Sequence, residues 1–465
     1  MRGPSDRSAL KKGSEEARRQ ESRDRGGTIL GPREMAFTRA NREWQRIRTM
    51  SPEQIRTLQL ERLNRVLSVA ATVEPYRSLW LGASHGPVDD LEALRDLPVI
   101  GRLDLTALPL HDRMPAGASA DHRSVSSGTS GRPLEVGWSA AEFGIREAHR
   151  VRAIEHAGFM RKRILNFVFG AMRNSPLATW RGHAYMGTFV DRADQLAAVR
   201  TVRPDVLIGS PSLLLDLAPD LEGLKLAGLA TGSEVLTPEM RAELRARFGA
   251  DSVDIYGLGE SSTVSWQCSR RNYHVDADAV IVEILDEGGS ALEPGQIGEV
   301  TLTTLWQTTS PLVRYRTGDI AALLPEPCNC GLPLPLMSQV EGRRDDWVIA
   351  ADGRRIAPFR FLIGTLGTDL VRDHVRAYRV IQQALDDFVI EVEWKDPAPE
   401  KVADRARAAY SRVVGMPVRV AVRSVERLTN PQAGKFRMVE SLVKPEKVTK
   451  PGTSSDGSAA GAARE

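Results

Sequence analysis

The stretch TPEMRAELRARFGADSVDIYG, residues 237–257, predicts a helix followed by a buried strand. Thr237 and Pro238 suit the N-cap and the first position of a helix, and Gly249 is a residue that commonly ends one. The apolar run VDIYG then has the length and composition of a strand. Two further strands are expected earlier, RILNFVFG at 163–170 and DVLIGS at 205–210. Because strands alternate with helices, the sequence predicts an α/β fold with a parallel sheet.

The predicted secondary structure is different in the part of the chain that follows this region. Residues 278–304 alternate apolar and polar residues around a Gly-containing turn, which predicts an antiparallel pair. Past residue 342, strand-like runs surround one helix-like run in a unit of about 100 residues, large enough for its own core. We therefore expect a disordered arm at 1–32, a large ATP- and acid-binding domain at 33–341, a small C-terminal lid domain at 342–445 and a disordered tail at 446–465.

Composition excludes several classes of protein. The chain has 465 residues, 42% hydrophobic and 26% charged, as in ordinary globular proteins of more than one domain. No apolar run approaches the roughly 18 residues that cross a bilayer, and the N-terminus lacks the apolar segment of a secretion signal. Three cysteines are too few for a disulfide framework. We expect a cytoplasmic protein with no membrane partner.

The net charge of +3 lies in the N-terminal arm, since residues 1–30 contain eight Lys or Arg and five Asp or Glu. In the rest of the chain basic and acidic residues are interleaved, without a basic stripe. We therefore expect no nucleic-acid partner. The opposing hypothesis is nucleic-acid binding through the arm, which predicts salt-dependent retention that is lost when the arm is removed.

A Ser/Gly-rich loop, SSGTSGRP at 126–133, is the sharpest local signal for chemistry. Its glycines permit a tight turn with exposed amides and its hydroxyls add donors, a combination that suits a phosphate. It is not a Walker loop, because Gly131 is followed by Arg132 and Pro133. Taken alone, such a run is also typical of a flexible loop.

Five further segments change this interpretation: TGSE at 231–234, DIYGLGE at 254–260, RYRTGD at 314–319, GRRDD at 342–346 and NPQAGKFR at 430–437. In this order, over about residues 40–445, they resemble the adenylate-forming superfamily of acyl-CoA synthetases, and most closely its phenylacetate–CoA ligase-like branch. The resemblance implies a large N-terminal α/β domain with mixed sheets and a small mobile C-terminal α+β domain. It also implies an enzyme that uses ATP and Mg²⁺.

The resemblance assigns the nucleotide to residues from three of these segments and the loop. The loop would grip the β- and γ-phosphates, the 232–234 backbone would line the adenine, Tyr256 would stack on it, and Asp319 would accept hydrogen bonds from both ribose hydroxyls. The implied nucleotide-binding residues are Ser127, Gly128, Thr129, Ser130, Gly131, Gly232, Ser233, Glu234, Tyr256, Gly257 and Asp319.

Four residues would carry the catalytic roles that the resemblance implies. Glu260 would help to hold Mg²⁺, which prefers oxygen ligands. Arg343 would support the ribose or the phosphates, and Asp345 would be the hinge between the domains. Lys435 would reach the substrate carboxylate and the α-phosphate. Only ten of the 63 basic residues are Lys, so a Lys at this position suggests that a compact ammonium is needed there.

Such a site would activate a carboxylic acid as an acyl-adenylate and pass the acyl group to a thiol, with coenzyme A as the leading acceptor. Alternatives are an amine, a carrier-protein thiol or a cofactor hydroxyl. Gly259 stands where the family usually has Ser or Thr, and this departure prompts a further alternative, a non-catalytic nucleotide-binding relative. The stretch after Asp345 matches the family's thiol-binding segment poorly, which puts coenzyme A in question more than adenylation. The oligomeric state stays open, with a homodimer as one alternative.

Residues 166–190 correspond to the segment where the family places its acid pocket. Phe167, Phe169, Trp180 and Tyr185 could wall an aryl or hydrophobic acid, although aromatic residues are more often core. Arg173 and His183 could instead meet a polar or second acidic group. The sequence leaves both interpretations open.

All three cysteines belong to a further constellation. Cys268 and His274 precede the Asp319 motif, and Cys328 and Cys330 follow it. Three thiols and one imidazole form a closed tetrahedral set for structural zinc. Relatives in the branch often carry a Cys-x-Cys-Gly segment here. The alternative is three free cysteines and an ordinary histidine.

Overall fold

The structure of the protein is a computed structural model. This structure describes residues 31–80, 87–126, 134–168, 177–180, 183–187, 190, 192–343, 347–353, 355–356, 361, 374–394, 400–426, 428 and 439–443. Among these residues, no helix is both long and apolar enough to cross a membrane.

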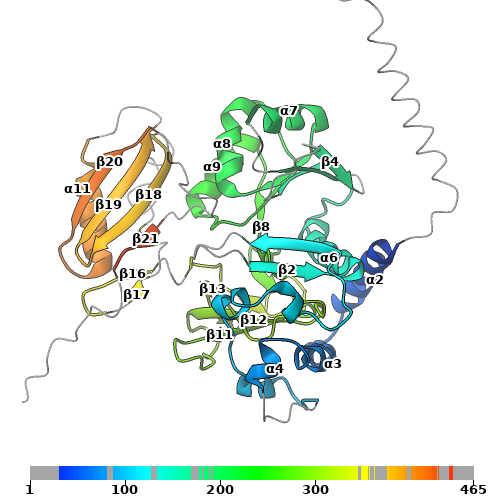
Figure 1. The fold of residues 1–465 in the computed structure, drawn as a ribbon. Coiled ribbons are helices and arrows are strands. Elements are labelled where there is room, and N and C mark those ends of the chain that lie inside the picture. Colours follow the sequence, from blue (N-terminus) through cyan, green and yellow to red (C-terminus); the bar gives the residue numbers. More distant parts are fainter. Residues whose placement is uncertain are drawn as a thin grey trace, which may run out of the picture.

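A ten-stranded mixed sheet forms the centre of the large N-terminal part (Figure 1). Its parallel strands are β3 (Ile164–Val168), β5 (His183–Gly187), β6 (Val206–Gly209), β7 (Gly228–Gly232) and β8 (Ser252–Leu258). The antiparallel strands are β4 (Leu177–Trp180) at one edge and β9 (Ser262–Gln267), β10 (Tyr273–Val275), β15 (Leu336–Met337) and β14 (Leu323–Leu324) towards the other. The parallel α/β fold class expected from the sequence is confirmed.

Helices cover both faces of the parallel strands. On one face, Leu165, Leu207 and Leu229 pack in a core with Leu214 and Leu244, which belong to the covering helices. These helices are α7 (Arg192–Val202), α8 (Pro211–Leu217) with the 3-10 turn η3 (Ala218–Leu221), and α9 (Pro238–Phe248). Thr237 caps α9 by accepting from the Met240 amide, and Gly249 ends it at φ +71°, as predicted.

The opposite face is covered by α6 (Ala140–His156), which also packs against α2 (Pro32–Ile47). Ile154 near the C-terminus of α6 belongs to the same core as Ile164, Val206 and Ala230 of the sheet. Buried charges tie these layers together: Arg152 donates to Asp276 at 2.7 Å and to Asp278 at 2.6 and 2.9 Å. This buried ion-pair group joins α6 to the loop that follows β10.

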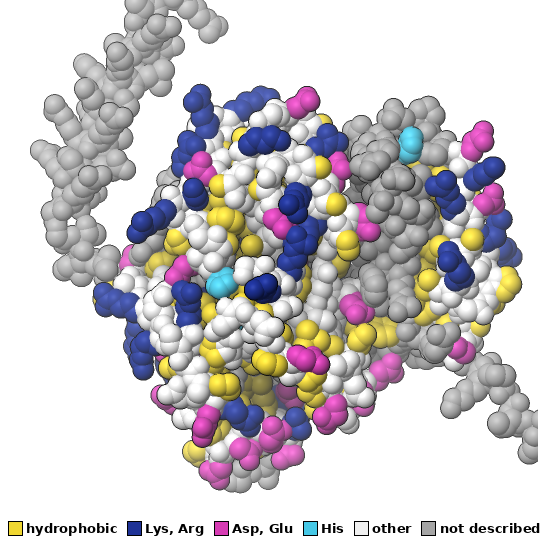
Figure 2. Space-filling model, turned by 180° about the vertical axis from the view of Figure 1, so that it is seen from behind, with side chains coloured by type: hydrophobic (Ala, Val, Ile, Leu, Met, Phe, Trp, Pro, Cys, Tyr) yellow, Lys and Arg dark blue, Asp and Glu magenta, His cyan; other side chains and the backbone are white. Residues whose placement is uncertain are grey.

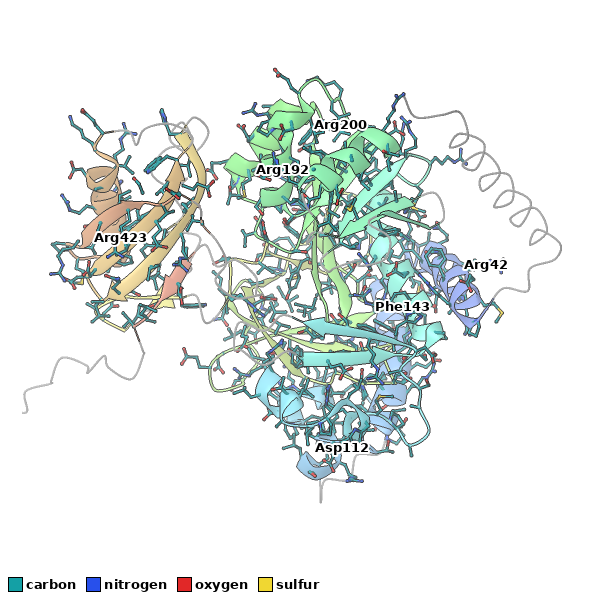
Figure 3. All side chains as sticks on the ribbon, turned by 45° about the horizontal axis from the view of Figure 1, so that its top comes forward. Arg42, Asp112, Phe143, Arg192, Arg200 and Arg423 are labelled. Carbon is teal, nitrogen blue, oxygen red and sulfur yellow. The ribbon has the colours of Figure 1, made fainter. Side chains whose placement is uncertain are left out.

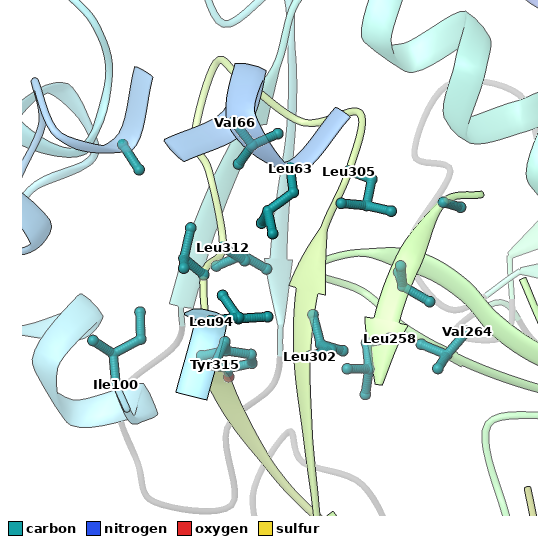
Figure 4. Close-up of a cluster of buried hydrophobic side chains, with 14 of the residues drawn as sticks. Leu63, Val66, Leu94, Ile100, Leu258, Val264, Leu302, Leu305, Leu312 and Tyr315 are labelled. Atoms are coloured by element: carbon teal, nitrogen blue, oxygen red, sulfur yellow. The ribbon is translucent and has the colours of Figure 1, made fainter. Parts of the chain in front are cut away.

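A second sheet, β11 (Val280–Leu285), β12 (Gly298–Thr304) and β13 (Tyr315–Ala321), is antiparallel, as expected for residues 278–304. It packs on α3 (Pro52–Ala70) through Leu63, Val66 and Leu302 (Figure 4). The hairpin β1 (His122–Ser126) and β2 (Leu134–Trp138) contributes to the same core. Short elements complete this part: α4 (Tyr76–Leu79), η1 (Glu92–Asp96), α5 (Arg102–Thr106) and η2 (Leu110–Arg113).

The C-terminal α+β unit has its own hydrophobic core and stands beside the large part in Figure 1. Phe361, Phe388 and Tyr410 pack together there, and the Tyr410 hydroxyl donates to the Phe361 carbonyl at 2.6 Å. Its elements are β16 (Val348–Ile349), β17 (Arg355–Ile356), β18 (Val375–Ala384), β19 (Asp387–Trp394), α11 (Val402–Val414), β20 (Arg419–Ser424) and β21 (Val439–Ser441). On the face of the molecule seen in Figure 2, basic and acidic side chains are interspersed.

Candidate active site

The carboxyl ends of β7 and β8 lie side by side, because Gly232 pairs with Ile255 in the parallel register. A Cβ atom at Gly232 would lie 2.7 Å from the Ile255 carbonyl oxygen, and one at Gly257 would lie 2.7 Å from the Ser262 carbonyl oxygen. Neither position has room for a side chain. The two glycines therefore permit the close backbone packing that brings residues 231–234 next to Tyr256.

Tyr256, Asp319 and Arg343 converge at this edge of the sheet from distant parts of the sequence. The Tyr256 hydroxyl donates to Oδ2 of Asp319 at 2.8 Å, and Nε of Arg343 donates to Oδ1 at 3.1 Å. Arg343 also donates from Nη2 to the Thr317 carbonyl at 3.1 Å. Burial, followed by the Asp319 charge, raises the pKa of Tyr256 well above its usual range, so its hydroxyl keeps its proton. The sequence named all three residues, and the structure brings them together.

Glu260 follows β8 directly, and its side chain is buried. Nη1 of Arg102, at the start of α5, donates to Oε1 of Glu260 at 3.1 Å. Burial, followed by the Glu260 charge, raises the pKa of the nearby Tyr315 hydroxyl. The expected metal-binding carboxylate thus already has a cationic neighbour. Sequence reasoning missed Arg102, because nothing in its local sequence connects it to a residue 158 positions away.

Glu234, which follows β7, and Asp254, which lies within β8, are both held by side-chain hydrogen bonds. The Ser212 hydroxyl donates to Oε1 of Glu234 at 2.9 Å. Asp254 is buried and accepts from the Thr231 hydroxyl at 2.6 Å and from the Tyr273 hydroxyl at 2.5 Å. Burial raises the pKa of Asp254, and these two hydrogen bonds act in the opposite direction. They fix the strand that carries Tyr256.

Some of the expected residues lie outside the described part of the chain. These are Ser127, Gly128, Thr129, Ser130, Gly131, Phe169, Arg173, Asp345 and Lys435, together with the side chain of Trp180. The strands that flank the phosphate loop are described: Ser126, the last residue of β1, pairs with Leu134, the first of β2. The loop therefore joins two adjacent strand ends.

His183 and Trp180 lie beside each other at one end of the main sheet. His183 begins β5 and pairs with Ile164, the first residue of β3, and Trp180 pairs with His183. Both therefore lie at the amino-terminal edge of the parallel strands, whereas Tyr256 and Gly232 lie at the carboxyl edge; the length of β5 between these edges is roughly 13 Å. The parallel register, which the sequence alone does not reveal, separates them from the nucleotide residues along the strand direction, and their role in the acid site stays a prediction.

Cys268, His274, Cys328 and Cys330 form one cluster, in which their ligand atoms all lie within 4.8 Å of one another. Sγ of Cys268 and Sγ of Cys328 are 3.7 Å apart, and Sγ of Cys330 is 3.2 Å from Nε2 of His274. Two sulfurs on one tetrahedral zinc lie about 3.8 Å apart, since each Zn–S bond is about 2.3 Å. His274 is fully buried, and its Nδ1 lies 3.3 Å from the Leu334 carbonyl, which leaves Nε2 directed at the thiols. The donor set fits a structural zinc ion.

The chain is similar to known proteins in sequence and in fold. No protein-family model matches the chain. The phenylacetate–coenzyme A ligase of Pseudomonas putida is 31% identical over 330 residues, 65% of this chain and 73% of the relative. The enzyme of the same name from Thermus thermophilus is 29% identical over 406 residues, 81% of this chain and 90% of the relative.

Solved structures show the same fold. A 2-hydroxyisobutyryl-CoA ligase in the postadenylation state superposes with a TM-score of 0.70 at 20% identity, covering 87% of this chain and 92% of the other. The anthranilate CoA ligase AuaEII gives a TM-score of 0.51 at 16% identity, covering 68% and 64%. The fold is thus that of adenylate-forming enzymes. Within this class, the chain belongs to the phenylacetate–coenzyme A ligase family.

Proposed function

We propose that this protein is an AMP-forming acid–thiol ligase. It condenses a carboxylic acid with ATP to an acyl-adenylate, releases pyrophosphate and transfers the acyl group to coenzyme A. The observation that carries this proposal is the convergence of Tyr256 and Arg343 on Asp319, beside the glycine-rich end of β7. Family membership supports it.

The nucleotide would occupy the carboxyl edge of the main sheet. Asp319 is oriented from both sides, since Tyr256 donates to one carboxylate oxygen and Arg343 to the other. A carboxylate held in this way has lone pairs left to accept the two ribose hydroxyls. Residues 232–234 follow β7 and would line the adenine, with the Tyr256 ring beside it. The loop at 127–131 would hold the β- and γ-phosphates.

The chemical step joins two anions, and the site supplies charge to oppose their repulsion. A carboxylate oxygen attacks the α-phosphorus, the bond to the β-phosphate oxygen breaks, and pyrophosphate leaves with that electron pair. Glu260 would hold Mg²⁺, which neutralises phosphate charge when bound. Arg102 holds the Glu260 carboxylate in place, and Lys435 would reach the α-phosphate from the small unit. Losing one such charged group typically costs about 10²–10³ in rate.

The separate core of the C-terminal unit supports a moving lid. In this proposal the large domain spans 33–341, the lid spans 342–445, and Asp345 lies at the hinge. Rotation of the lid would withdraw Lys435 after adenylation and admit the acyl acceptor. Coenzyme A is the favoured acceptor because the related enzymes carry it in their names. An amine or a carrier-protein thiol stays an alternative.

ATP–pyrophosphate exchange tests the proposal, with a panel of aryl, alkyl and amino acids. We expect exchange with at least one acid, and its loss in Asp319→Ala. Lys435→Ala should lose most of the exchange, while a preformed acyl-adenylate is still consumed in the presence of coenzyme A. Nucleotide binding without exchange for any acid would instead favour the non-catalytic alternative that Gly259 prompted. Equal loss of both half-reactions in Lys435→Ala would contradict its assigned role.

We also propose that Cys268, His274, Cys328 and Cys330 bind a structural zinc ion. Four protein ligands close the coordination shell, so the metal would brace the end of β9 and would take no part in the reaction. Elemental analysis of purified protein should give about one zinc per chain. A metal content far below this, in protein purified without chelator, would refute the assignment.

A further inference from the structure

A buried carboxylate, that of Asp254, joins four neighbouring strands of the main sheet. Asp254 lies within β8, and the proposed reaction does not use it. Its Oδ1 accepts from the Thr231 hydroxyl of β7 at 2.6 Å, and its Oδ2 accepts from the Tyr273 hydroxyl of β10 at 2.5 Å. Its amide donates to Oε1 of Gln267, the last residue of β9, at 3.1 Å. The strands β7, β8, β9 and β10, which are adjacent in the sheet, are thus linked at one residue.

On one side, Asp254 fixes the two strand ends that would carry the nucleotide. Thr231 is its direct partner in the parallel register of β7 and β8, and Gly232 is the next residue of β7. Tyr256 follows two residues later in β8, with its hydroxyl 2.8 Å from Oδ2 of Asp319. A displacement of β8 by about 1 Å would take that contact out of hydrogen-bond range. The candidate nucleotide site therefore depends on the spacing that the Thr231 hydroxyl holds.

On the other side, the link begins in the β9–β10 hairpin, which carries two of the four proposed zinc ligands. Gln267 directly precedes the ligand Cys268 in the chain. Tyr273 directly precedes the ligand His274. Both hairpin residues that contact Asp254 are therefore next in sequence to a proposed metal ligand.

Hydrogen bonds attach the turn of this hairpin to the rest of the proposed zinc site. The Cys268 amide donates to the Asn272 carbonyl at 3.0 Å, which closes the turn. Nδ2 of Asn272 donates to Sγ of Cys328 at 3.1 Å. A structural metal contributes folding energy directly, so its loss would loosen this turn. Since Tyr273 is the residue that follows Asn272, its hydroxyl would lose its fixed place with the turn.

We propose that the zinc site and the nucleotide site are coupled through Tyr273 and Asp254, so that the bound metal strengthens the binding of ATP. This inference rests on the proposed function and on the proposed zinc ion, and it adds a positioning role for Tyr273. Gln267 is also held by Nη2 of Arg241 in α9 at 2.6 Å, so the contact of Tyr273 depends more directly on the turn. Tyr273 would act through Asp254 and would touch neither the nucleotide nor the acid.

Calorimetric titration with ATP and Mg²⁺, without an acid substrate, tests the coupling apart from the reaction. We expect the dissociation constant for ATP to rise about fivefold or more in Tyr273→Phe, the lower end of ordinary coupling between two sites, at unchanged zinc content. In pyrophosphate exchange, the KM for ATP should rise by a similar factor and kcat should change little. Thr231→Val, which removes the other hydroxyl, should have the same effect on ATP binding, whereas Thr231→Ser should retain most of the wild-type affinity.

Removal of the metal completes the test. Cys330→Ser should reduce the zinc content without a chelator, which leaves Mg²⁺ available, and should weaken ATP binding to a similar extent. In the double variant with Tyr273→Phe the two losses should not add, because both act on the same link. Tyr410→Phe is the matched control: it deletes a buried hydroxyl of the C-terminal unit, which Arg423 marks in Figure 3, and should leave the dissociation constant for ATP unchanged.

The outcomes separate the proposals. An unchanged dissociation constant for ATP in both Tyr273→Phe and Thr231→Val would overturn the inference and leave the proposed function standing. Losses in Cys330→Ser and Tyr273→Phe that add in full, or wild-type protein without zinc, would do the same. Absence of exchange with every acid would overturn the proposed function, while ATP binding would still report on the coupling. Wild-type protein that binds no ATP would overturn both.

Discussion

Removing the Tyr256 hydroxyl is the sharpest perturbation of the candidate nucleotide site. Tyr256→Phe keeps the ring that would stack on adenine and deletes only the donor that lies 2.8 Å from Oδ2 of Asp319. Asp319 is only 7% exposed, so water replaces that donor poorly. A hydrogen bond to a charged group contributes about 1.5–3 kcal/mol, which corresponds to about 10- to 150-fold in a binding constant. Since Arg343 still holds Oδ1, we expect the lower part of that range.

The assay is the KM for ATP in pyrophosphate exchange, measured with a saturating acid. We expect this KM to rise about tenfold in Tyr256→Phe. Tyr410→Phe is a matched control, because it deletes a buried hydroxyl that donates at 2.6 Å within the core of the C-terminal unit. It should lower the melting temperature and leave the KM for ATP unchanged. An unchanged KM in Tyr256→Phe would refute the view that this hydroxyl orients Asp319 for the nucleotide.

Three further predictions concern stability. Arg152→Met leaves the buried Asp276 carboxylate without a cation and Asp278 with Arg62 alone, and should lower the free energy of unfolding in urea by about 3–5 kcal/mol; a loss below 1 kcal/mol would contradict the pairing. Cys330→Ser should reduce the zinc content and the melting temperature together, whereas a lower melting temperature at full zinc content would argue against this ligand. Burial, followed by the Arg152 charge, lowers the pKa of His149 well below 6.5, and Asp278 opposes this shift only in part. Because the unfolded state then binds a proton more readily than the native state, the free energy of unfolding should fall as the pH drops below about 6.5. His149→Gln should reduce this pH dependence, measured by urea titrations at pH 5 and 7.5.

Local signals in the sequence predicted much of the fold. Thr237 and Gly249 mark the two ends of α9 because capping depends on neighbouring residues alone. Tyr256, Asp319 and Arg343 could be named because each stands in a short motif, and the order of these motifs along the chain is specific. The resemblance supplied their roles, and the structure supplied their contacts.

Other features depend on contacts that no local pattern encodes. Arg102 contacts Glu260, which is 158 positions away in the sequence. The sequence indicates a strand around His183 but not which of its ends faces the nucleotide, and the register places His183 at the amino-terminal end of β5.

The parallel pairing of β21 with β18 constrains how the proposed catalytic lysine can travel. Val439 is hydrogen-bonded into the small sheet beside Val380, and Lys435 precedes Val439 by four residues. Four residues of extended chain span at most about 14 Å, so this terminal strand acts as an anchor that carries the lysine wherever the sheet rotates. Proteolytic clipping between the two residues would leave Lys435 attached to the small unit only through the preceding chain, whose nearest described anchor is the hydrogen bond from the Leu428 amide to Glu393, so the ammonium group would be held at one end instead of two.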